Sequence, residues 1–152
     1  MDSTFALLKP DTALQPSGFA IIEDILARGL RLTAMRQIVH PSPADVESFL
    51  SELKVANPEA YDRNFPHLCR GPLVALRFTG IDPVKTLRDL VGCTDPAAAS
   101  PGTLRATYGK DTLASATAEG RGLRNAIHAA DSPESVEREG SIWFPHWHLY
   151  GV

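Results

Sequence analysis

Apolar residues occur in short blocks separated by proline and glycine, and their spacing changes from block to block. Four apolar runs have the length and alternation of β-strands: residues 4–9, 30–39, 73–78 and 125–129. Between and after them, apolar residues recur three and four positions apart, typically after a Ser-Gly, Ser-Pro or Asp-Pro pair. This spacing predicts helices over 17–29, 42–53, 82–91 and onward from 132.

Two segments have weaker patterns. Residues 55–71 contain Asn57-Pro58 and Phe65-Pro66, which interrupt the apolar periodicity, so we expect only a second short helix there. Residues 92–124 are rich in Pro, Gly, Ala and Thr and are predicted to be mostly loop.

The order of strands and helices predicts an α+β fold. A ferredoxin-like four-stranded antiparallel sheet with helices packed on one face fits this order, although periodicity alone leaves other α+β layouts open. The chain has 152 residues and contains no internal repeat or linker, so we expect one domain over residues 1–152.

The composition excludes several classes of protein. The net charge of −3 argues against a protein that binds nucleic acid through bulk positive charge, although a few local cations suffice for one small anion. The sequence has no apolar run long enough to cross a membrane and no secretory signal, so no membrane partner is expected. Cys69 and Cys93 form no CxxC motif, and a cytoplasmic location is the default.

Several familiar motifs are absent. Gly109-Lys110 lacks the other residues of a phosphate-binding Walker loop, and no zinc-protease or serine-hydrolase motif is present. His146 and His148 are only two possible metal ligands, so we interpret them as part of a solvated C-terminal tail. The aromatic content of residues 145–152 nevertheless favours a docked tail over a free one.

Seven polar residues stand where chemistry is possible. Each also has an ordinary explanation when taken alone: a histidine beside Ile127 is more often a hydrogen-bonded core residue, and an arginine is more often a surface ion-pair partner. The seven residues are Lys9, Arg88, Thr94, Arg105, Asn125, His128 and Glu139.

Four blocks in a fixed order change this assessment. They are TFALLKPD (4–11), GPLVAL (71–76), GCTDPAAASPGTLRATYG (92–109) and RNAIHAADSPES (124–135). From about residue 3 to 145 the sequence resembles the nucleoside diphosphate kinase family. Four motifs carry this resemblance through their order and spacing: Lys-Pro-Asp, Arg-x-x-x-x-x-Thr, Pro-Gly-Thr-x-Arg and Asn-x-x-His-x-x-Asp-Ser. No single motif suffices for the assignment, but the four in sequence are highly specific.

The resemblance implies transfer of the γ-phosphoryl group of a nucleoside triphosphate to a nucleoside diphosphate by a ping-pong route. In such an enzyme His128 carries the phosphoryl group, which suits an imidazole nitrogen near neutral pH. Glu139 matches the residue that orients the histidine, and Asn125 matches the residue that binds the sugar hydroxyl. The residues that match the family's phosphate ligands are Lys9, Arg88, Thr94 and Arg105.

The resemblance also implies a cofactor and an assembly. Mg²⁺ would arrive with the nucleotide phosphates and not on a dedicated protein site. Family members assemble as hexamers or tetramers built from dimers, so a homo-oligomer is expected. Asp131, shortly after the histidine, is a possible helper of the site.

Three departures from the family pattern set further expectations. Ala129 and Ala130 replace the Gly and Ser after the histidine, which removes a hydroxyl near Glu139 and predicts reduced turnover. Leu50 lies where the family places a tyrosine, and either Tyr61 or Phe65 is the candidate for the ring that stacks on the base.

The third departure is an insertion. The stretch 106–124 is longer than in the family, with residues 112–120 inserted, and we consider a neutral surface loop first, then a lid or an oligomer contact. Two alternatives to an active kinase remain: a regulatory module that binds nucleotides without transfer, and a protein-histidine phosphotransfer partner.

Overall fold

The computed structural model describes residues 2–151 and contains one four-stranded antiparallel sheet. The strands lie in the order β2-β3-β1-β4, so β1 is central and pairs with both β3 and β4. The strands are β1 (Asp2–Leu8), β2 (Arg31–Ile38), β3 (Leu73–Gly80) and β4 (Ile127–Ala129). This confirms the predicted α+β, ferredoxin-like architecture.

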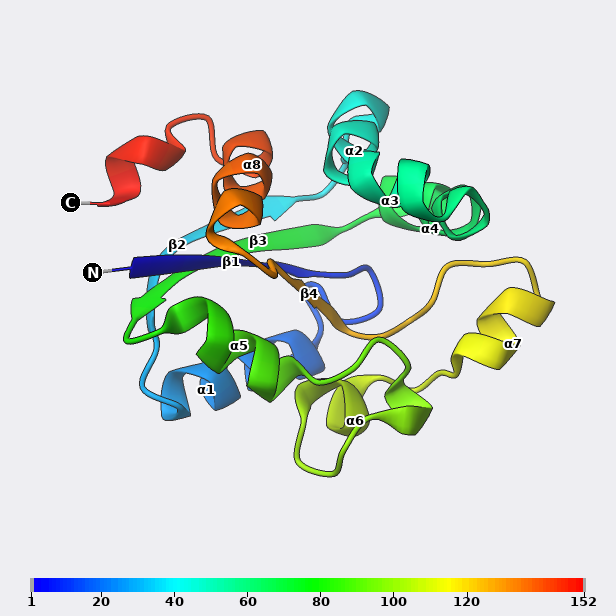
Figure 1. The fold of residues 1–152 in the computed structure, drawn as a ribbon, viewed down its shortest axis with the longest axis horizontal. Helices are drawn as coiled ribbons and strands as arrows, with labels where there is room; N and C mark the ends of the chain where they lie inside the picture. Colours follow the sequence, from blue (N-terminus) through cyan, green and yellow to red (C-terminus); the bar gives the residue numbers. More distant parts are fainter. Residues whose placement is uncertain (1, 152) are drawn as a thin grey trace.

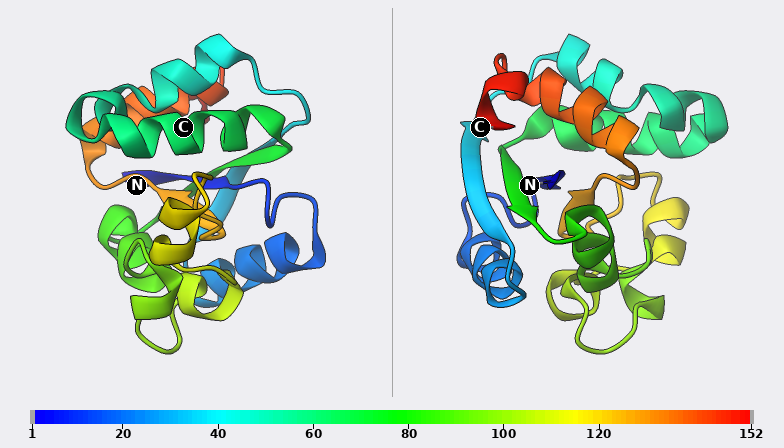
Figure 2. Two further views of the ribbon diagram at one scale, coloured as in Figure 1. Left: turned by 90° about the vertical axis from the view of Figure 1, so that its right-hand side faces the viewer. Right: turned by 60° about the vertical axis from the view of Figure 1, so that its left-hand side comes forward.

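Helices cover both faces of the sheet, whereas we expected them on one face (Figure 1). The first layer holds α1 (Pro16–Ala27), α5 (Pro83–Val91) and α6 (Leu104–Tyr108). The opposite layer holds α2 (Pro43–Phe49), α3 (Ser51–Ala56), α4 (Pro58–Arg70) and α8 (Pro133–Trp143). Figure 2 shows these two layers on opposite sides of the sheet.

The alternation of side chains along β1 explains the two layers. Ala6 and Leu8 pack into the core beside α1 and α5, while Phe5 and Leu7 pack into a second core beside α2, α4 and α8. Because successive side chains of a strand point to opposite faces, a strand whose residues 5–8 are all apolar needs cover on both sides. The continuous apolar run was therefore a signal for two helical layers.

The segment before β3 is more helical than its sequence pattern indicates. α4 continues through Pro66 and has 13 residues. A proline inside a helix removes one backbone hydrogen bond. Here the helix begins with Pro58, the Asn57 side chain accepts a hydrogen bond from Ala60 N at 3.1 Å, and Leu68 is buried on its inner face. These interactions offset the interruption.

Residues 92–124 contain three short helices and are not mostly loop. They are η1 (Pro96–Ala98), α6 and α7 (Leu113–Ala118). The side chains of Thr103 and Thr112 each accept a backbone hydrogen bond and cap α6 and α7. Helices of five and six residues are too short to give a periodic apolar pattern, which is why the sequence did not indicate them.

The C-terminal tail is docked on the layer of α8. Trp147, in η2 (Trp147–Gly151), is 3% exposed and packs edge-to-face on Phe5 with ring centroids 6.2 Å apart. The Arg77 guanidinium lies 5.0 Å from the Trp147 ring centroid. The expectation of a solvated tail was wrong at Trp147, although His146 and His148 are exposed. Val152 lies outside the described residues.

Candidate active site

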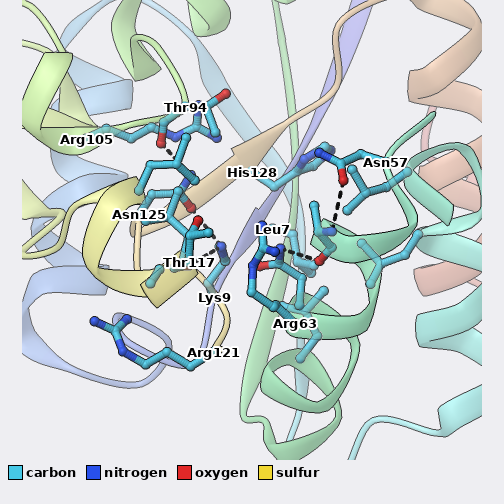
Figure 3. Close-up of a pocket in the computed structure, with 18 of the residues that line it drawn as sticks. Leu7, Lys9, Asn57, Arg63, Thr94, Arg105, Thr117, Arg121, Asn125 and His128 are labelled. Carbon is cyan, nitrogen blue, oxygen red and sulfur yellow. Dashed lines mark hydrogen bonds between the residues drawn. The ribbon is translucent and has the colours of Figure 1, made fainter. Parts of the chain in front are cut away.

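Six of the seven candidate residues line one cavity of about 560 Å³ between the two helical layers. The cavity lies at the end of the sheet where β1 and β4 meet, with α4 on one side and α7 on the other (Figure 3). The six residues are Lys9, Arg88, Thr94, Arg105, Asn125 and His128. The seventh, Glu139, is buried and hydrogen-bonded to His128. The sequence reasoning therefore named one physical site.

His128 is held by two neighbours. It is the middle residue of β4 and pairs with Leu7 of β1. Its Nε2 lies 2.7 Å from Glu139 Oε2, and the Phe49 ring meets its imidazole edge-on with centroids 4.9 Å apart. Because an ionised carboxylate only accepts hydrogen bonds, the N–H is at Nε2 and the lone pair is at Nδ1. Nδ1 is thus the ring nitrogen that this contact leaves free.

Lys9 follows directly after β1 and is almost fully buried. Its ammonium donates to Leu123 O at 2.6 Å and to Asn125 Oδ1 at 2.7 Å. Burial is the main cause that lowers the Lys9 pKa to about 8, while Asp11 acts in the opposite direction. Two of its three N–H donors are in use, so one remains for a ligand.

Arg105 is held by backbone carbonyls on two segments. Its Nε and Nη2 donate to Ile127 O at 3.2 and 2.9 Å, and its Nη1 donates to Gly92 O at 3.1 Å. Burial, with a further contribution from Arg88, lowers the Arg105 pKa to about 10. Of the five guanidinium N–H donors two remain unused, which is the number that a bidentate grip on a phosphate requires.

Arg88 and Thr94 lie closer to solvent. Arg88, in the last turn of α5, donates to Ala129 O at 3.4 Å. The Thr94 carbonyl accepts a hydrogen bond from Asn125 Nδ2 at 2.9 Å. The carbonyl of Thr94 thereby fixes Asn125, whose amide oxygen in turn holds Lys9.

The backbone between Asn125 and His128 is in an unusual conformation. Ala126 has φ of 73°, a region that residues with a side chain rarely adopt. Its N–H donates to Asp11 Oδ2 at 2.9 Å, and its carbonyl accepts from Thr12 Oγ1 at 2.6 Å. These two partners, one half-buried and one buried, hold the turn that aims Asn125 and His128. Sequence reasoning missed both, and only the KPD motif around Asp11 gave a signal.

The cavity is strongly cationic. Arg63 of α4 and Arg121 line it together with Lys9, Arg88 and Arg105, and the residues that line it include no aspartate or glutamate. The described chain therefore concentrates positive charge here despite its net charge of −3. Phosphate groups are the ligands that such an array of guanidinium and ammonium groups suits.

The inserted stretch forms a wall of the cavity. Leu113, Ala116 and Thr117 of α7 line it, and Ala116 is buried. Asp111, just before α7, accepts hydrogen bonds from both terminal nitrogens of Arg121, at 2.6 and 2.9 Å. This ion pair lowers the Asp111 pKa well below its usual range. The insertion is therefore not a neutral surface loop.

The expected stacking ring is not in the cavity. Tyr61 is buried in the core and packs against Phe65, with ring centroids 5.5 Å apart, and neither lines the cavity. The α4 wall is instead formed by Ala60, Arg63 and Asn64. The interrupted pattern of residues 55–71 hid the register of this helix.

Comparison with known proteins decides the family. The family model for nucleoside diphosphate kinase matches residues 2–149. The chain belongs to the nucleoside diphosphate kinase family. It is 32% identical over 151 residues to a nucleoside diphosphate kinase of Archaeoglobus fulgidus, covering 95% of this chain and 87% of the relative. It is also 32% identical over 143 residues to human nucleoside diphosphate kinase 3, covering 94% and 77%.

A solved structure agrees with this membership. The NDP kinase of Pyrobaculum aerophilum has a TM-score of 0.83 and 29% identity to this chain, covering 94% of this chain and 95% of that one.

Two further findings concern the described residues. None of their helices is long and apolar enough to span a bilayer. Within residues 2–151, no group of three or more His, Cys, Asp or Glu side chains is arranged to hold a metal.

Proposed function

We propose that His128 carries the phosphoryl group in this nucleoside diphosphate kinase. Family membership gives the overall reaction, which is transfer of a γ-phosphoryl group from a nucleoside triphosphate to a nucleoside diphosphate through a phosphohistidine. The single observation that carries the residue assignment is the 2.7 Å contact between His128 Nε2 and Glu139, which leaves Nδ1 as the free nitrogen of a cavity-lining imidazole. Residues 1–152 form one domain in this proposal.

The first half-reaction follows from this arrangement. The Nδ1 lone pair attacks the γ-phosphorus, the bond from that phosphorus to its bridging oxygen breaks, and the electron pair leaves with the nucleoside diphosphate. The imidazole gains positive charge as the N–P bond forms, and the buried Glu139 carboxylate stabilises that charge through Nε2–H. The second half-reaction is the reverse, with the acceptor's terminal phosphate oxygen as the nucleophile.

The cations of the cavity hold the phosphates during both steps. Arg105 and Lys9 are already fixed by hydrogen bonds to the backbone, so their remaining donors need little reorganisation when phosphate arrives. Arg88 and Thr94 complete the phosphate ligands, and Asn125 takes the sugar hydroxyl. The base lies between α4 and α7, against aliphatic and amide groups, and the aromatic ring of the cavity, Phe49, meets His128 instead.

Mg²⁺ would reach this site with the nucleotide. The residues that line the cavity present no carboxylate, the donor that Mg²⁺ usually takes from proteins, whereas a triphosphate supplies oxygen ligands of its own. The residues present therefore fit a metal that is bound by the nucleotide and by water. Its role would be to neutralise charge on the phosphates.

We also propose that the protein is a homo-oligomer built from dimers through the β2 edge. Among the strands of residues 2–151, β2 pairs with β3 alone, so its other edge presents unpaired backbone groups. Met35 on β2 is 50% exposed, and on α1 Phe19 is 54% and Leu26 41% exposed. A second copy that covers this face would bury all three.

The free thiols of Cys69 and Cys93 fit the proposed cytoplasmic location.

A coupled assay tests the kinase function. The protein is mixed with Mg²⁺, ATP and a second nucleoside diphosphate, and formation of the second triphosphate is followed. Wild type is expected to transfer and His128→Gln to lose nearly all activity. Nucleotide binding without transfer by the wild type would instead identify the regulatory module.

A further inference from the structure

Glu139 lacks one partner that the family pattern would give it. Ala130, two residues after His128, is fully buried and has no hydroxyl where the family has serine. His128 binds only one oxygen of the Glu139 carboxylate, Oε2. The other oxygen, Oε1, belongs to a side chain that is only 5% exposed, so water is not a ready substitute. A different group must satisfy it.

Arg138 is that group. Its Nη2 donates to Glu139 Oε1 at 3.2 Å. The rest of the guanidinium lies against α2 and α3: Nε is 3.1 Å from Glu52 Oε1 as an ion pair, and Nη1 is 3.5 Å from the carbonyls of Ser48 and Phe49. Phe49 is the residue whose ring meets the His128 imidazole. Arg138 therefore contacts both residues that hold the histidine ring: Glu139 through its carboxylate and Phe49 through its backbone carbonyl.

We propose that Arg138 is a positioning residue for phosphoryl transfer, and that it holds Glu139 in place of the missing serine hydroxyl. This inference rests on the proposed role of His128. The terminal torsion of a glutamate is broad, so a carboxylate held through one oxygen rotates easily. With both oxygens bound, Oε2 stays aligned with Nε2, and the ring keeps its N–H there and its lone pair at Nδ1.

The arrangement also links the histidine to the cavity wall. Glu52 is in α3 and Phe49 ends α2, and both helices precede the α4 wall of the nucleotide cavity. Arg138 itself does not line that cavity. Loss of its guanidinium should therefore slow the chemical step more than it weakens nucleotide binding.

The test compares Arg138→Met with two other variants. Methionine keeps much of the apolar stem but removes all donors. Glu52→Gln is the matched control, since it removes the ion pair to α3 and leaves the Arg138–Glu139 bond. Ala130→Ser in the Arg138→Met background restores a hydroxyl where the family has one. The readouts are kcat and KM for ATP, and the ¹⁵N shifts of the His128 ring, which report its tautomer.

We expect Arg138→Met to lower kcat about tenfold, in line with the loss of one charged hydrogen bond, and to leave KM within about twofold. Its ¹⁵N shifts should show more of the Nδ1–H tautomer, Glu52→Gln should behave as wild type, and the added serine should recover most of the kcat. Wild-type kcat and ¹⁵N shifts in Arg138→Met would overturn the inference. So would loss of kcat with an unchanged tautomer and no recovery by serine.

Labelling of the wild type with [γ-³²P]ATP separates this inference from the proposed function. If wild type takes no label on His128, the proposed function fails. If wild type is labelled and Arg138→Met is labelled at the same rate, the proposed function stands and only the role of Arg138 is refuted.

Discussion

Lys9 makes nucleotide binding depend on pH in a way that can be calculated. Burial lowers its pKa to about 8, so the free enzyme loses this positive charge between pH 7 and 9. A bound diphosphate brings negative charge beside the ammonium and raises its pKa again. If the nucleotide binds only the charged form, its apparent Kd rises about tenfold from pH 7 to pH 9. Binding at pH 8.5 then takes up about 0.8 proton per site.

Isothermal titration calorimetry measures this uptake directly. Mg²⁺-ADP is titrated at pH 8.5 in several buffers of different ionisation enthalpy, and the slope of the observed heat against that enthalpy gives the protons taken up. Lys9→Met is the control, because it keeps the length of the side chain and cannot titrate. No uptake by the wild type, or an equal uptake by Lys9→Met, would refute the reasoning.

The same shift affects stability with a definite sign. The folded-state pKa of Lys9 lies below its ordinary value, so the unfolded chain binds more protons between about pH 8 and pH 10. In the absence of nucleotide, the contribution of Lys9 to the free energy of unfolding therefore rises across this window.

Three further outcomes are expected. Leu113→Ala removes apolar surface from the α7 wall and should raise KM for ATP about tenfold with kcat nearly unchanged. An unchanged KM would mean that α7 does not contact the bound nucleotide. Trp147→Ala should lower the free energy of unfolding by about 3–5 kcal/mol in urea titrations, and a loss below about 1 kcal/mol would mean that the tail is not docked. Because Arg121 lowers the pKa of Asp111, this ion pair stabilises the fold above about pH 4, and its contribution is lost on acidification. Asp111→Asn should therefore flatten the fall of the melting temperature at acid pH. An acid profile of the melting temperature equal to that of the wild type would contradict the ion pair.

The sequence predicted those parts of the fold that depend on local pattern. The four strands, the helices with two or more apolar turns and the family motifs all follow from residues near one another in the chain. The second helical layer followed from the continuous apolar run of β1, but we interpreted that run as a sheet covered on one face. Pro66 within α4 was misleading, because tertiary packing of Leu68 and a capped start offset its local cost.

The site was predictable in its motif residues and not in its supports. The family pattern located His128, yet nothing local indicates that Arg138 reaches Phe49 of α2 or that Phe49 meets the imidazole. Such contacts depend on how α2 and α8 pack together, which is a property of the whole fold. The wall formed by α7 was hidden for the same reason: an insertion has no counterpart in a family pattern.

The most direct test of the central claim is to locate the phosphoryl group on the protein. Wild type is incubated with Mg²⁺ and [γ-³²P]ATP without acceptor, digested, and the labelled residue is identified by mass spectrometry and by its phosphohistidine isomer. We predict about one acid-labile phosphate per chain on Nδ1 of His128, which moves to added GDP and is absent from His128→Gln. Label on another residue, on Nε2, or undiminished in His128→Gln would contradict the account.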